Sequence, residues 1–169
     1  MEANDVLLES FGRVRELVEG VLDGLDRDGV LAAPGPEANP IGWLVWHIAR
    51  GQDAQIAQLT GDEQVWITGG WAPRFGLEPD PRNMGYGHGP ADVAAVQPES
   101  VQVLLDYYDA VWAITEPYLR GITPADLDRV IDERWDPPVT LGVRLVSIVD
   151  DDVQHAGQAA YVKGLLDRS

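Results

Sequence analysis

The sequence predicts an all-α protein, a four-helix bundle with one long crossover between its second and third helices. Two observations support this fold class. Apolar residues recur at steps of three and four in four long stretches, as on the buried face of a helix. Glycine and proline crowd the segment between the second and third stretches. The length of 169 residues and the 45% apolar content suit a single domain over residues 1–169.

The first two helices are expected on either side of a short loop. Residues 4–27 have helical apolar spacing, and Asp28-Gly29 is the expected stop. Residues 32–40 are rich in proline and glycine and form the loop. Asn39 has the chemistry of a helix N-cap, which predicts a second helix over residues 40–60.

The crossover spans residues 61–98, where glycine and proline are too dense for regular structure. A loop of this length in a compact domain is often functional. Its aromatic residues are too apolar for a solvated linker, so we expect them to pack over the bundle. They are Trp66, Trp71, Phe75 and Tyr86.

The second half of the chain contains the other two long helices. The third is predicted over residues 98–120, followed by a short helical turn at 124–129. Extended structure is expected over residues 130–139. The fourth long helix is predicted over residues 141–166, with Thr140 as its cap.

Composition excludes several classes of protein. The net charge of −16 disfavours binding to nucleic acid or to an anionic membrane. The chain has no cysteine, which excludes disulfides, iron–sulfur clusters, Cys-ligated zinc and a cysteine nucleophile. The N-terminal segment lacks the features of a signal peptide and no stretch is long and apolar enough to span a membrane, so we expect a cytoplasmic protein.

The histidines are the residues most informative about function. Asp151 and His155 lie four residues apart on a largely apolar face of the fourth helix, whereas Asp150 and Asp152 are expected to be solvated. His47 lies in an apolar stripe of the second helix. Side chains on facing helices build the metal sites of four-helix bundles, so these residues could form a two-His, one-carboxylate site with open positions. The alternatives are hydrogen-bonded core histidines and a simple Asp–His ion pair.

His88 lies between two glycines in the crossover. It is either an ordinary surface histidine or, if the crossover folds over the end of the bundle, a residue that contacts a substrate or adds a fourth metal ligand. The flanking glycines permit a close backbone approach.

Two segments resemble motifs of the DinB-like superfamily of four-helix metalloproteins. They are WLVWHIARG, over residues 43–51, and DVQHAGQ, which starts at Asp152 and follows Asp151. The similarity is greatest to the actinobacterial branch of mycothiol-dependent transferases and the maleylpyruvate isomerase N-terminal domain. It implies a divalent metal ion on His47, Asp151 and His155, with zinc first and nickel or iron as alternatives. Asp151 departs from that family, in which Glu or His is more usual.

The same resemblance implies a metal-dependent transferase that joins a low-molecular-weight thiol to a small electrophile, and for such an enzyme we expect His88, from its place in the crossover, to contact the substrate. It also implies a homodimer. Two alternatives remain open. One is a non-catalytic, dimeric binding or stress-response module with a vestigial metal site. The other is a metal-dependent hydrolase, which would use the same ligands to activate water.

Overall fold

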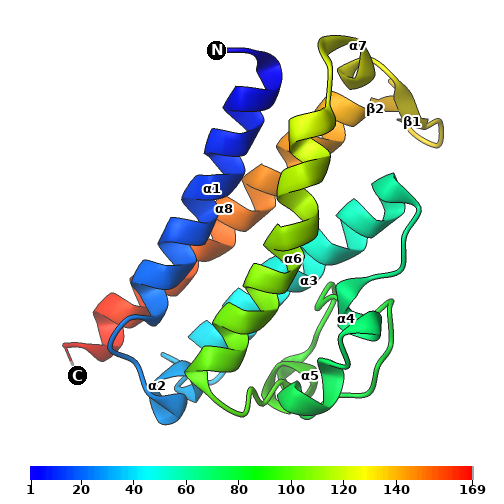
Figure 1. The fold of residues 1–169 in the computed structure, drawn as a ribbon. Helices are drawn as coiled ribbons and strands as arrows, with labels where there is room; N and C mark the ends of the chain where they lie inside the picture. Colours follow the sequence, from blue (N-terminus) through cyan, green and yellow to red (C-terminus); the bar gives the residue numbers. More distant parts are fainter. Residues whose placement is uncertain (169) are drawn as a thin grey trace.

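Four long helices form the body of the protein in the computed structural model, which describes residues 1–168 (Figure 1). They are α1 (Ala3–Leu22), α3 (Ile41–Thr60), α6 (Val101–Gly121) and α8 (Leu141–Leu166). Helices α1 and α3 each pack against both α6 and α8, so the four enclose a common core. The predicted all-α bundle is confirmed, as is the long crossover between its second and third long helices.

The first helix is shorter than predicted. Helix α1 ends at Leu22, and Gly24 just beyond it has a left-handed φ of +75°. The chain restarts as α2 (Arg27–Leu31), where the Asp26 side chain accepts a hydrogen bond of 2.8 Å from the amide of Gly29. The predicted stop at Asp28-Gly29 is therefore wrong, because both residues lie inside α2.

The starts of α3 and α6 also differ from the prediction. Pro40 is the extended N-cap of α3, so the prediction that Asn39 caps this helix is wrong by one residue. Helix α6 starts after Ser100, whose side chain accepts a hydrogen bond from the amide of Val103. Because Ser100 provides this cap, Pro98 lies outside the helix and not in its first turn.

The crossover contains short helical turns that the sequence analysis did not predict. They are α4 (Val65–Thr68), η1 (Ala72–Phe75) and α5 (Pro90–Ala95). Trp66 and Phe75 are fully buried, and their rings pack against Tyr107 of α6 with centroids 5.3 and 5.8 Å away. The crossover therefore packs over the bundle as predicted, except that Tyr86 is 94% exposed.

A small hairpin connects α6 to α8. It follows α7 (Pro124–Leu127) and pairs β1 (Val130–Asp132) with β2 (Val139–Thr140) in antiparallel orientation. The Thr140 side chain accepts a hydrogen bond from the amide of Val143, so α8 starts where the sequence predicts.

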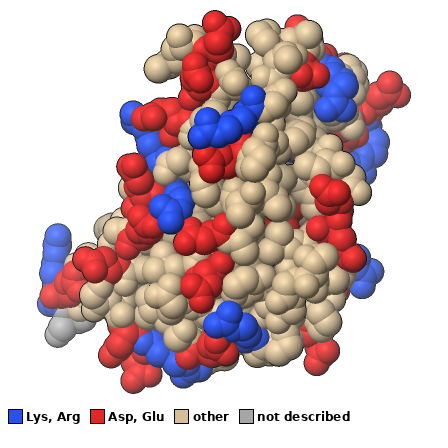
Figure 2. All heavy atoms as spheres, viewed as in Figure 1, with Lys and Arg blue, Asp and Glu red and all other residues tan. Residues whose placement is uncertain are grey.

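Acidic side chains are spread over the face of the molecule shown in Figure 2, with basic side chains between them. They are not gathered into one patch on that face. Within residues 1–168, no helix combines the length and apolar character needed to cross a membrane.

Candidate metal centre

Helices α3 and α8 bring His47, Asp151 and His155 together. Nε2 of His47 lies 3.8 Å from Oδ2 of Asp151, and Nε2 of His155 lies 3.5 Å from Oδ1 of the same carboxylate. One donor atom from each residue falls within a span of 4.8 Å. The shorter aspartate side chain therefore reaches both imidazoles, although the family more often has Glu or His there.

The crossover determines which nitrogen His47 offers to this cluster. Its Nδ1 donates a hydrogen bond to the carbonyl oxygen of Met84, because a carbonyl can only accept. In the neutral ring, the lone pair is then on Nε2, the atom that faces Asp151. The ring also stacks on Trp43, with centroids 4.8 Å apart and planes 16° from parallel. Hydrogen bonding and stacking thus set both the tautomer and the orientation of His47.

His155 is arranged in the same way from within its own helix. Gln158, one turn further along α8, has its side-chain oxygen 3.0 Å from Nδ1 of His155. Nδ1–H donates to that oxygen, which leaves Nε2 directed at Asp151. The two imidazole rings meet edge to face, with centroids 4.6 Å apart. Both histidines therefore present Nε2 to one shared carboxylate.

The surroundings shift the pKa values of the three groups in different directions. Burial lowers the pKa of His47, so this ring is neutral at physiological pH. The hydrogen bond with Asp151 raises the pKa of His155, and the same interaction lowers the pKa of Asp151. In the metal-free protein, Nε2 of His155 is thus the main site at which a proton would compete with a cation.

Gly85 leaves the space that this cluster needs. A Cβ on Gly85 would lie 2.8 Å from Nδ1 of His47 and 2.9 Å from the Trp43 ring, and its φ of +94° suits only glycine. A Cβ on Gly51 would lie 3.9 Å from Oδ2 of Asp151, an ordinary van der Waals contact, so that position does not require glycine. The crossover backbone therefore lies directly against the ligand helix.

The donor set fits a divalent transition-metal ion. Donor atoms on a tetrahedral zinc ion, at bond lengths of about 2.1 Å, lie about 3.4 Å apart. The separations of 3.5 and 3.8 Å from Asp151 to the two imidazoles are close to that value. The side chain of Asp151 is 47% exposed, so solvent reaches the cluster on the carboxylate side. Two imidazoles and one carboxylate also leave coordination positions for water or substrate.

Asp152 is not solvated, which corrects the sequence-based expectation. It is 1% exposed, and its Oδ2 has no hydrogen-bond partner among the described residues. The buried stripe of α8 runs through Ile148, Asp152 and Ala156, so Asp151 and His155 lie at its edge and not at its centre. Burial raises the pKa of Asp152 well above its ordinary value.

Arg50 holds the crossover against the ligand helix. It is fully buried, one turn after His47, and its guanidinium donates to the carbonyl oxygens of Asn83 and Pro81 at 3.0 and 3.2 Å. Its charge is balanced by Asp53 at 3.3 Å, and both side chains are inaccessible to solvent. Since Met84 follows Asn83, the arginine fixes the backbone segment whose carbonyl accepts the hydrogen bond from His47.

Asp53 anchors the start of the crossover in the same interior. Its two carboxylate oxygens accept hydrogen bonds of 2.8 Å from the amides of Val65 and Trp66, in the first turn of α4. The hydroxyl of Tyr107 donates a further bond of 2.8 Å. The buried carboxylate is thus well satisfied, and the crossover is tied to α3 near its start by Asp53 and in its middle by Arg50.

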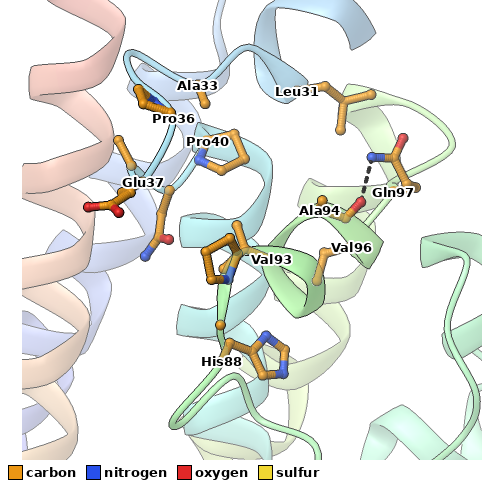
Figure 3. Close-up of a pocket in the computed structure, with 14 residues that line it drawn as sticks. Leu31, Ala33, Pro36, Glu37, Pro40, His88, Val93, Ala94, Val96 and Gln97 are labelled. Carbon is orange, nitrogen blue, oxygen red and sulfur yellow. Dashed lines mark hydrogen bonds between the residues drawn. The ribbon is translucent and has the colours of Figure 1, made fainter.

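His88 lies close to these residues but outside the three-residue cluster. One ring nitrogen accepts from Trp43 at 3.1 Å and the other bonds to Asn83 at 2.8 Å. The ring also borders a pocket of about 250 Å³ between the segment 31–40 and α5. Figure 3 shows His88 at the lower end of the residues that line this pocket. The other candidate ligands do not line it.

The residues that orient the ligands were not among the predicted site residues. A signal was present for Gln158, which lies in the motif segment DVQHAGQ at the i+3 position from His155. Trp43 lies in the motif segment WLVWHIARG, four residues before His47, but the motif alone does not indicate that its ring stacks on the imidazole. No local pattern could have identified the Met84 carbonyl, because that contact depends on the path of the crossover.

Comparison with known proteins agrees with this fold. The chain matches the DinB superfamily over residues 10–159. It is also similar to the crystal structure of a conserved protein from Enterococcus faecalis. The two share 35% sequence identity and superimpose with a TM-score of 0.91, over 100% of this chain and 99% of the other. No curated protein matches. With a family match over most of its length, the chain belongs to the DinB superfamily.

Proposed function

We propose that this protein binds a divalent metal ion and transfers a low-molecular-weight thiol of the mycothiol type to a small electrophile. One observation carries the metal part of the proposal: both imidazoles have Nδ1 engaged in a hydrogen bond and direct Nε2 toward the Asp151 carboxylate. The thiol and the electrophile come from the resemblance to the mycothiol-dependent branch.

His47, Asp151 and His155 would hold the ion. Nitrogen and oxygen donors suit zinc, and they also accept nickel or iron. A divalent cation at this position supplies Lewis acidity, which lowers the pKa of a thiol and stabilises the thiolate needed for attack on an electrophile. The chain contains no cysteine, so the sulfur of such a reaction has to come from a cosubstrate.

The protein's own side chains prepare the site for this chemistry. Asp151 supplies a negative charge next to the two imidazole donors. Its exposed side leaves access for a cosubstrate, whereas Trp43 covers one face of the His47 ring. Gln158 and the Met84 carbonyl keep the imidazole protons away from the ligand atoms. His88, at the border of the neighbouring pocket, is our predicted contact for the electrophile.

Metal analysis is the first test. Protein purified without chelator should contain about one equivalent of metal per chain, and His155→Ala should lose it. Asp150→Ala is the matched control, since Asp150 is exposed on the same helix and lies outside the cluster. Absence of metal in the wild-type protein under every loading condition would overturn the proposal.

The second test distinguishes transfer from hydrolysis. The metal-loaded protein is incubated with a thiol and monochlorobimane, and separately with p-nitrophenyl acetate alone. Thiol conjugation that His155→Ala abolishes supports the transferase. Ester hydrolysis without conjugation would identify a hydrolase, and neither activity in a metal-bound protein would favour the non-catalytic module. The predicted homodimer is checked by light scattering during size-exclusion chromatography.

A further inference from the structure

The hydrogen bonds of His88 assign it a single neutral tautomer. The indole N–H of Trp43 can only donate, so Nδ1 of His88, 3.1 Å away, carries a lone pair. The proton of the neutral ring is then on Nε2, where it is donated to the side-chain oxygen of Asn83 at 2.8 Å. The backbone carbonyl of Asn83 in turn accepts from Arg50. His88 is therefore held between the indole and a fixed part of the crossover.

Trp43 connects His88 to the candidate metal centre. The indole is 5% exposed, and its face stacks against the imidazole of His47. Its N–H edge bonds to His88, while the His88 ring is itself stacked on Trp46, with centroids 5.7 Å apart and planes 20° from parallel. His88 thus fixes the orientation of the Trp43 indole at its N–H edge, and the face of the same indole supports His47.

We propose that His88 is a positioning residue that acts through Trp43 on His47. By accepting the indole N–H, it fixes the ring on which His47 stacks, and thereby the direction of the His47 Nε2. This inference rests on the proposed metal function and deepens it, because it adds a residue that supports a ligand from outside the cluster.

The role follows from the burial of the indole. A buried N–H without an acceptor is unfavourable, so loss of His88 favours rotation of the Trp43 ring toward another partner or solvent. His47 then loses part of its stacking surface and keeps the Met84 carbonyl and the edge contact with His155 as constraints. Loss of an outer partner of a metal ligand typically weakens metal affinity about 10–100-fold.

The test is a set of four variants titrated with Co²⁺, whose visible spectrum reports coordination. His88→Ala should weaken Co²⁺ binding by about tenfold or more. His88→Asn should restore most of the affinity, because its side-chain oxygen can replace Nδ1 as the acceptor. Trp43→Phe keeps a ring but has no N–H, so adding His88→Ala to it should cause little further loss.

Two results would overturn the inference. One is an equal effect of His88→Ala in the wild-type and Trp43→Phe backgrounds. The other is a His88→Asn variant as weak as His88→Ala with an altered Co²⁺ spectrum, which would make His88 a direct ligand. Thermal unfolding of each variant identifies any effect that comes from loss of the fold.

A measurement on the metal-free protein separates this inference from the proposed function. In NMR spectra, His88→Ala should shift both the Trp43 indole N–H and the His47 imidazole signals, and His88→Asn should shift them less. An unchanged His47 signal would overturn the positioning role. Failure of the wild-type protein to bind Co²⁺ would instead overturn the proposed function and leave this NMR test intact.

Discussion

The buried carboxylate of Asp152 should reduce the stability of the protein at neutral pH, and Asp152→Asn should recover it. The side chain is 1% exposed, and its Oδ2 has no partner among the described residues. A buried polar group left without a hydrogen bond costs about 1–3 kcal/mol, and more when it is charged. We therefore expect Asp152→Asn to raise the free energy of unfolding near pH 8 by about 1–3 kcal/mol.

The ionisation of Asp152 determines how the free energy of unfolding changes with pH. The folded-state pKa of Asp152 is raised well above the ordinary value of 3.8 by burial. Below 3.8 both states hold the proton, so the carboxyl contributes its full stability there. That contribution is lost as the pH rises through the folded-state pKa. The reason is that the carboxyl ionises more readily in the unfolded chain than in its buried position. Asparagine does not ionise, so the advantage of Asp152→Asn should grow with pH.

Thermal unfolding between about pH 5.5 and 8 measures this difference, above the pI of about 4.3 at which solubility is lowest. In a domain of this size, each kcal/mol corresponds to about 2–4 °C in Tm. Asp150→Asn, a substitution at the exposed neighbour, should change stability by less than about 0.5 kcal/mol. A gain that is the same at both ends of the pH range, or a lower stability of Asp152→Asn near pH 8, would refute the reasoning.

Three further predictions concern the metal centre and its supports. Gly85→Ala should destabilise the fold by about 1–3 kcal/mol and weaken Zn²⁺ binding, because its Cβ would collide with His47; calorimetry of both properties checks this. Arg50→Lys should speed amide hydrogen exchange in the segment 81–88, since a lysine cannot serve all the acceptors of a buried guanidinium; unchanged exchange would contradict the role given to this residue. Zn²⁺ affinity should fall by up to about tenfold per pH unit as the pH drops below the pKa of His155, because a proton then competes with the ion for Nε2. The hydrogen bond with Asp151 raises this pKa. Titration calorimetry at several pH values measures the affinity, and a flat profile would show that the proton does not compete.

Periodicity and cap chemistry predicted much of the fold. The four long helices follow from apolar spacing, and the start of α8 follows from Thr140. The predicted length of the first helix was too great, because the helix ends before Gly24, which has a left-handed φ. The Asp28-Gly29 pair was a poor guide to the end of the helix, because Asp-Gly pairs occur both in turns and inside helices. Local sequence determines that a helix forms more strongly than it determines where the helix ends.

The candidate site could be predicted only in part, because local spacing places residues on one side of a helix but does not determine where that side faces. The separation of Asp151 and His155 by four residues places them on one side of a helix wherever that side faces. The rotation of α8 about its axis depends on packing against α1 and α3, and it buries Asp152 instead of centring the stripe on His155. The contacts from Met84, Gly85 and Asn83 depend on tertiary structure, so the sequence pattern held no signal for them.

The hydrogen bond between His47 and the Met84 carbonyl has a consequence for protein design. The three ligands lie on two helices, so they could be copied onto any antiparallel helix pair with the same spacing. Such a copy would leave Nδ1 of the first histidine without its acceptor, and either nitrogen could then turn toward the ion. The transferable unit is therefore the helix pair together with residues 81–88, with a glycine retained where the backbone passes over the imidazole.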